Sequence, residues 1–124
     1  MSKSSSNTVS PAEVIEKSGA DILRLWVASS DYSEDLKIGP EIIKSNIDSY
    51  RRLRNTLRFI LGNLSDFDQD EKVSVDELDE LDLYILSELE SLKKEVISNY
   101  KIFEYQKVFS AIFNFCTNDL SSFY

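Results

Sequence analysis

The sequence predicts a mainly α-helical protein, in which an antiparallel bundle of long helices follows a small α/β segment. Apolar residues recur every three or four positions over residues 40–63 and again over 78–100, which is the period of amphipathic helices. Proline and capping-type residues mark where these helices begin. The 42% apolar and 29% charged residues fit a folded domain better than a disordered tail.

The first 38 residues are expected to form a separate small segment, beginning with a polar loop. Ser10 to Glu13 matches a capping box with proline at the first helical position, so a helix is predicted there that ends before Gly19. A second, largely buried helix is predicted over residues 20–28. The alternation in residues 36–38 predicts a short extended stretch.

Residues 39–124 are expected to form the helical bundle. Gly39 and Pro40 open a helix that continues to about Asn63. After an acidic linker, a second capping box at residues 74–77 predicts a helix to about Tyr100. A third helix is predicted from roughly residue 105 to residue 120.

This third helix is apolar on nearly every side, and two preceding helices cannot enclose it. We therefore expect either that the chain self-associates through residues 105–124 or that further helices follow Tyr124. A complete three-helix bundle is the weaker alternative, because the sequence stops on Phe123 and Tyr124 without a polar tail.

Composition removes several classes of site. The chain has no histidine, which excludes imidazole ligands and histidine-based catalysis, and its single cysteine excludes disulfides and cysteine zinc sites. Cys116 is interpreted as a buried structural thiol. The acidic run from Asp66 to Asp82 lacks the spacing and central glycine of a calcium loop, so no metal is expected. No apolar run is long enough for a membrane span and no signal peptide is recognisable, so a cytoplasmic location without membrane contact is expected.

The net charge of −8 argues against a free-standing nucleic-acid binder, but the charge is uneven. Residues 66–90 contain eleven acids and one base, whereas residues 44–58 contain five bases and one acid. The basic stretch is therefore the place to look for an anionic partner.

Four of the five arginines lie in this basic stretch. On a helix Arg51, Arg54 and Arg58 fall within roughly 60° of one another, beside the apolar stripe. Such a ridge suits phosphates. The alternative is pairing with Asp79 or Asp82 of the next helix. Pairing is favoured for Arg54, and RNA contact is favoured for Arg51 and Arg58.

Arg52 is expected to point nearly away from the apolar stripe, alongside Phe59. An aromatic ring in this place is able to stack on a base, but packing against the N-terminal segment is the preferred interpretation.

The N-terminal Met1, Ser2, Lys3 and Ser4 place a lysine in a loop of small residues, where it is able to reach a phosphate. Four residues of this kind are a weak signal alone.

Together these segments resemble class I aminoacyl-tRNA synthetases, and the isoleucyl-tRNA synthetases in particular. Residues 1–4 are similar to the end of the KMSKS signature, and Gly19-Ala20-Asp21 with Leu23-Arg24 resembles the GAD-x-LR stretch of the isoleucine, valine and leucine enzymes. Four further stretches resemble the isoleucine branch in particular: residues 25–32 (LWVASSDY), 50–56 (YRRLRNT), 114–116 (NFC) and 119–121 (DLS). The preceding signature lysine is absent, and Ser6 stands where the family usually has glycine.

The resemblance implies that the parent protein attaches isoleucine to its tRNA using ATP with magnesium, Lys3 contacting the ATP phosphates. It implies that residues 10–38 link the catalytic domain to an anticodon-binding bundle that begins near Pro40. The catalytic and editing domains would lie upstream. Because no histidine is present, the HIGH motif is absent, so the chain alone is expected to be inactive and to bind no cofactor.

Two other assignments stay open. A piece of a valyl- or leucyl-tRNA synthetase is disfavoured by the stretch from Trp26 to Tyr32. An all-α protein–protein interaction module is supported by the net acidity and by the apolar third helix.

Overall fold

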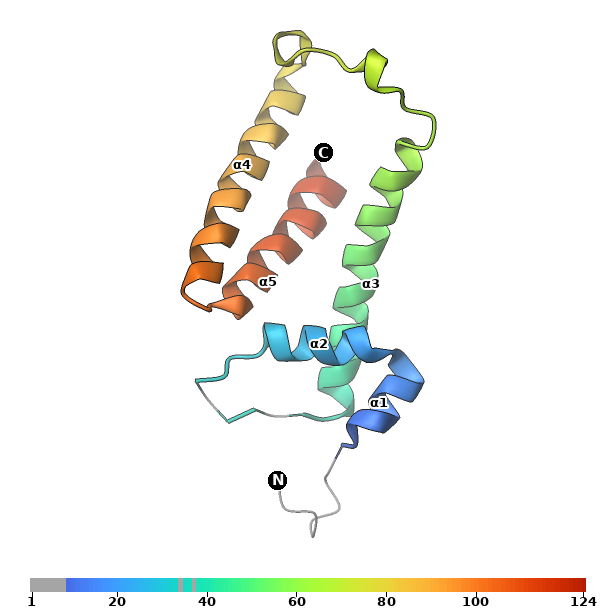
Figure 1. Cartoon of the computed structure of the whole chain (residues 1–124), viewed down its shortest axis with the longest axis vertical. Helices are drawn as coiled ribbons and strands as arrows, with labels where there is room; N and C mark the ends of the chain where they lie inside the picture. Colours follow the sequence, from blue (N-terminus) through green and yellow to red (C-terminus); the bar gives the residue numbers. More distant parts are fainter. Residues whose placement is uncertain (1–8, 34, 37) are drawn as a thin grey trace.

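A computed structural model describes residues 9–33, 35–36 and 38–124, and helices make up most of this part (Figure 1). The α-helices are α1 (Pro11–Ser18), α2 (Ala20–Ser29), α3 (Pro40–Asn63), α4 (Glu80–Lys101) and α5 (Tyr105–Asn114). A π-helix, η3 (Phe115–Phe123), continues α5, and two 3-10 turns, η1 (Gln69–Glu71) and η2 (Val75–Glu77), lie between α3 and α4. The predicted mainly helical class is confirmed. The extended stretch expected near residue 36 forms no strand in the described part.

The three longer helical segments run up, down and up, with α5 lying behind and between α3 and α4 (Figure 1). α5 packs against α4 and α2, and η3 packs against α3. α2 crosses the lower end of the bundle and also contacts α1 and α3. The first segment is thus held against the base of the bundle.

Helix α1 begins and ends where the sequence predicts, but one cap differs. Ser10 makes no side-chain capping hydrogen bond, so the predicted capping box with Glu13 is not formed. The start of the helix instead uses Pro11 and a backbone bond from Val14 N–H to the Ser10 carbonyl, 3.3 Å. Gly19 ends the helix at φ 88°, a conformation in which a Cβ is strained.

The second capping box is formed, but it caps a turn and not the long helix. The Glu77 carboxylate accepts from the backbone N–H and the hydroxyl of Ser74, both at 3.0 Å. Leu78 then takes an extended conformation, and α4 starts only at Glu80. The predicted start after Ser74 was therefore wrong, because the extended Leu78 separates the turn from the helix.

The core at the base of the molecule joins both parts of the chain. Val14, Ile22 and Ile43 are buried together, and Ile47 and Tyr50 pack against them. Beside them the buried Asn46 donates to the Ile42 carbonyl at 2.9 Å and accepts from the Ser29 hydroxyl at 3.2 Å. This pair ties α2 to α3.

The third helical segment is only partly enclosed. Val108, Phe115 and Cys116 are buried, whereas Phe123 and Tyr124 are exposed. The helix is wider at its end, where the Tyr124 N–H donates to the Asp119 carbonyl, five residues back, and the Ser121 hydroxyl donates to the Cys116 carbonyl. The predicted continuous α-helix to residue 120 is therefore replaced by a π-helix from Phe115 onward.

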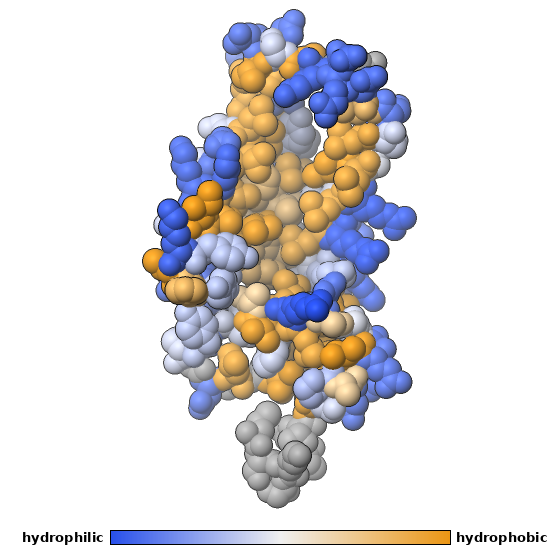
Figure 2. Space-filling view, in the orientation of Figure 1, coloured by the Kyte–Doolittle hydropathy of each residue, from blue (hydrophilic) through white to orange (hydrophobic). Residues whose placement is uncertain are grey.

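A hydrophobic hollow runs between α3 and α4 over α5 (Figure 2). Large apolar side chains on the two helices remain exposed, among them Leu57 and Leu61 of α3 and Leu86 and Leu89 of α4. Across the described ranges, no helix is both long and apolar enough to cross a membrane.

Candidate functional site

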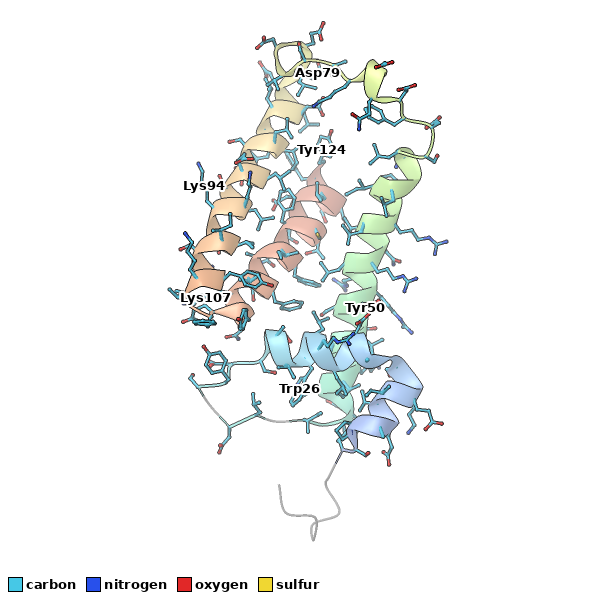
Figure 3. All side chains as sticks on the ribbon, in the orientation of Figure 1. Trp26, Tyr50, Asp79, Lys94, Lys107 and Tyr124 are labelled. Atoms are coloured by element: carbon cyan, nitrogen blue, oxygen red, sulfur yellow. The ribbon has the colours of Figure 1, made fainter. Side chains whose placement is uncertain are left out.

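Helix α3 carries the arginines on surfaces that no other element covers. Arg51, Arg52, Arg54 and Arg58 are all exposed. Nitrogen-tipped side chains project from the outer side of α3, away from α4 and α5 (Figure 3). By helix geometry Arg51, Arg54 and Arg58 share one side of α3, whereas Arg52 lies about 100° around the helix from Arg51 and lines a hollow with Phe113 of α5.

Little negative charge from the chain itself neutralises this ridge. The guanidinium of Arg51 lies 3.9 Å from the carboxylate of Asp48, a long contact between two exposed groups that stabilises the fold little. Within the described residues, Arg52, Arg54 and Arg58 form no ion pair. Asp82, an expected partner of Arg54, accepts instead from the Tyr124 hydroxyl, and this hydrogen bond raises the pKa of Tyr124.

Phe59 differs from the expectation drawn for it. Its side chain is 74% exposed, so it does not pack against the described part of the N-terminal segment. On α3 it follows Arg52 by seven residues and Asn55 by four, which places the three side chains along one stripe of the helix. All three are exposed.

Met1, Ser2, Lys3 and Ser4 lie outside the residues that the structure describes.

Two shallow hollows have mixed linings. One, of about 600 Å³, lies beside α3 and is lined by acids and bases in equal number, with Phe113 at its edge: Glu41, Lys44, Asp48 and Arg52. The other, of about 400 Å³, lies between α4 and α5 and includes Glu88, Glu95, Asp119 and Lys107. Neither concentrates positive charge as the outer side of α3 does.

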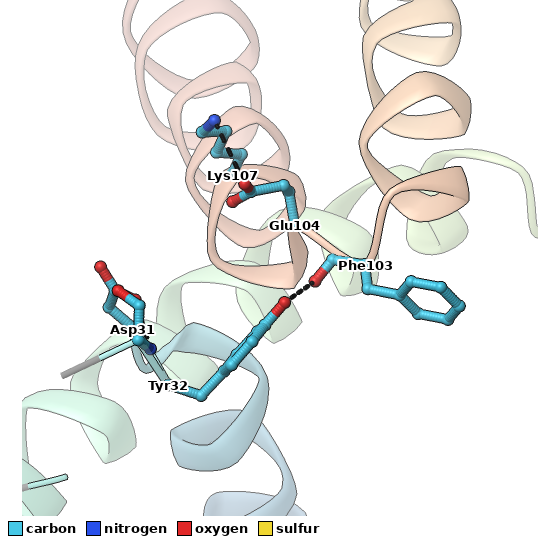
Figure 4. A network of polar contacts seen from close by, with 6 residues as sticks. Asp31, Tyr32, Phe103, Glu104 and Lys107 are labelled. Atoms are coloured by element: carbon cyan, nitrogen blue, oxygen red, sulfur yellow. Dashed lines mark hydrogen bonds and ion pairs between the residues drawn. The ribbon is translucent and has the colours of Figure 1, made fainter. Parts of the chain in front are cut away.

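A polar network, which the sequence did not reveal, joins the segment after α2 to the turn between α4 and α5 (Figure 4). The Tyr32 hydroxyl donates to the Phe103 carbonyl at 3.1 Å, and Lys107 lies 3.7 Å from Glu104. The Ser33 hydroxyl and backbone N–H both donate to Asp31 and lower its pKa. Because partners 71 residues apart meet here, no local pattern predicts the contact.

Cys116 is a free, buried thiol whose pKa is raised by burial, which is the opposite of what a nucleophile needs. Among the residues with described positions, no three acidic or cysteine side chains are grouped to hold a metal ion.

Comparison with known proteins identifies the stretch. The family model for class I tRNA synthetases (I, L, M and V) matches residues 1–39, and the model for the anticodon-binding domain of tRNA ligase matches residues 82–124. Isoleucine–tRNA ligases from Ruegeria pomeroyi, Petrotoga mobilis and Desulforudis audaxviator are 53%, 51% and 48% identical over the whole chain. The chain belongs to the isoleucyl-tRNA synthetases.

The chain spans only 13–14% of the length of these relatives. All three relatives carry the isoleucine name, which agrees with the motifs that favoured this branch over the valine and leucine enzymes.

Proposed function

We propose that this chain is part of an enzyme that attaches isoleucine to its tRNA in the cytoplasm, using ATP with magnesium. Within that enzyme residues 1–38 belong to the catalytic end and residues 39–124 to the anticodon-binding end. The chain alone does not catalyse the reaction and binds no cofactor. Its own contribution is a tRNA-contacting surface on α3.

The proposed tRNA-binding surface rests on one observation, which is the exposed arginine ridge on an otherwise acidic chain. Arg51 and Arg58 share the outer side of α3, where guanidinium groups are able to bind phosphate oxygens in pairs. Arg54 lies between them and has no ion pair within the described part of the chain. The ridge thus remains available to RNA.

The experiment is a titration of the chain with isoleucine tRNA across a salt series. Replacing Arg51 and Arg58 with alanine removes two phosphate contacts, so the slope of log affinity against log salt falls by about two. Lys94→Ala is the matched control, because Lys94 is also exposed but lies on the far side of α4 (Figure 3). Unchanged binding by the double variant at every salt concentration would remove the ridge from the tRNA interface.

The ATP role rests on Lys3 and is tested in the longer polypeptide. Lys3→Ala lowers the rate of isoleucine-dependent exchange between ATP and pyrophosphate. The reason is that the lysine's positive charge, which stabilises the negative charge developing on the phosphates, is lost. Binding of tRNA is retained. An exchange rate equal to that of the unchanged enzyme refutes the assignment.

We also infer that the isolated chain self-associates. The expected contact surface comprises residues 105–124, of which Phe123 and Tyr124 are exposed. The hydrophobic hollow between α3 and α4 adds a larger apolar area beside them (Figure 2).

A further inference from the structure

Phe59 is the most exposed of the large apolar side chains in the described part of the chain, at 74%. Leaving most of this ring in water forgoes the stabilisation that burial of its apolar surface would give. A ring held out in this way on a well-formed helix is therefore a candidate for contact with something outside the chain.

The surroundings of Phe59 decide what kind of partner fits. Its helix stripe continues through Asn55 and Arg52, which are exposed and polar. The exposed leucines of α3, Leu57 and Leu61, lie on the opposite flank of the arginine ridge, toward the hydrophobic hollow. An apolar protein interface needs several neighbouring apolar side chains, and this stripe offers a single ring among hydrogen-bonding groups.

One aromatic face with an arginine and an amide beside it suits an unpaired nucleotide. The ring accepts a base by stacking, the amide is able to bond to a base edge, and the guanidinium is able to bond to a phosphate. Arg52 lies two helical turns before Phe59, about 10 Å along the axis, and has no ion pair among the residues described.

Building on the tRNA-binding function proposed above, we propose that Phe59 stacks on an unpaired base of the bound tRNA. Asn55 and Arg52 bind the edge and the phosphate of the same stretch of nucleotides. The arginine ridge then supplies general phosphate affinity, whereas the Phe59 stripe selects a place where the RNA is single-stranded.

The test uses the 124-residue chain and an isoleucine tRNA transcript, with three substitutions at one site. Phe59→Ala weakens binding roughly tenfold, because stacking on one base is lost. Phe59→Leu weakens it similarly, since leucine keeps apolar area but has no π face. Phe59→Trp retains the affinity. The salt slope is the same in all three, because no charge is removed.

Leu61→Ala is the matched control, being a comparably exposed apolar change two residues away on another flank. Unfolding in urea is measured for each variant, and a change at so exposed a position leaves the midpoint unaltered. Equal tRNA affinity of the Phe59→Leu variant and the unchanged chain would show that any apolar side chain suffices at this position, which overturns stacking.

The outcomes also separate this inference from the function beneath it. If the double variant Arg51→Ala/Arg58→Ala weakens tRNA binding and Phe59→Ala does not, the tRNA-binding surface is supported and the stacking of Phe59 is refuted. If the unchanged chain binds no tRNA at low salt, both the tRNA-binding surface and the stacking of Phe59 are refuted.

Discussion

Asn46 shows at the scale of one residue how the base of the molecule is fastened. It is a buried amide beside a core made by apolar side chains, and both ends of its side chain are hydrogen-bonded. Burying an amide without hydrogen-bond partners destabilises the fold. The stability contributed by Asn46 therefore depends on its hydrogen bonds to Ser29 and Ile42.

Asn46→Ala is expected to destabilise the chain by about 1 kcal/mol, since its hydrogen bond with the Ser29 hydroxyl between α2 and α3 is lost, while that hydroxyl keeps the Trp26 carbonyl as an acceptor. Urea unfolding followed by circular dichroism measures the change. Ser45→Ala, an exposed neighbour on the same helix, is the control and shifts the midpoint little. Equal midpoints for the two variants would contradict the role given to Asn46.

Gly19 provides a second residue-scale prediction. At φ 88° and ψ 157° it occupies a region that side-chain-bearing residues rarely adopt, so Gly19→Ala costs about 1–3 kcal/mol of stability. Gly62→Ala is the matched control. It lies within α3 with open space around the added Cβ, so it is neutral or slightly stabilising. Thermal unfolding of both variants checks the opposite signs.

Among elements, the capping box before α4 makes a pH-dependent contribution to folding. The backbone N–H and the hydroxyl of Ser74 both bind the Glu77 carboxylate and lower its pKa below the ordinary 4.5. A lowered folded-state pKa means that the stabilisation is present above the ordinary pKa. It is lost as the pH falls through the folded-state value.

A carboxyl titration by NMR should therefore give Glu77 a midpoint below 4.5. In Ser74→Ala the hydroxyl is removed but the backbone donor stays, so the midpoint moves up only part of the way. A Glu77 midpoint that is the same in both proteins would show that the hydroxyl has no influence on this carboxylate.

Elements were predictable where local chemistry decides them. The bounds of α3 follow from Pro40 and a long apolar period, and those of α1 from Pro11 and Gly19. The start of α4 was missed because a local signal, the capping box at Ser74, is used by a short turn. The π-helix was missed because it depends on where the last turns pack and on hydroxyl bonds five residues back.

The candidate site was predictable to the same extent. Helical spacing alone placed Arg51, Arg54 and Arg58 on one side of α3. Whether Arg54 pairs with Asp82, and whether Phe59 is covered, depends on how α4 and the first segment lie against α3. Such contacts between distant parts of the chain leave no periodic trace in the sequence.

At the scale of the whole molecule, the charge and the apolar surface are distributed unevenly. The basic side of α3 faces outward, while the acids gather in the 66–90 stretch at the other end of α3 and along α4. Between the two helices lies the hydrophobic hollow (Figure 2).

The isolated chain is therefore expected to form concentration-dependent dimers or larger species, because an apolar surface of this kind is costly to leave in water. Leu57→Gln, on the α3 side of the hollow, shifts the equilibrium toward monomer. Val75→Gln, at a comparably exposed position in the linker, leaves it unchanged. Sedimentation velocity over a concentration series measures both variants beside the unchanged chain. A clean monomer at high concentration would refute self-association, whereas equal dissociation by the two variants would remove the hollow as its cause.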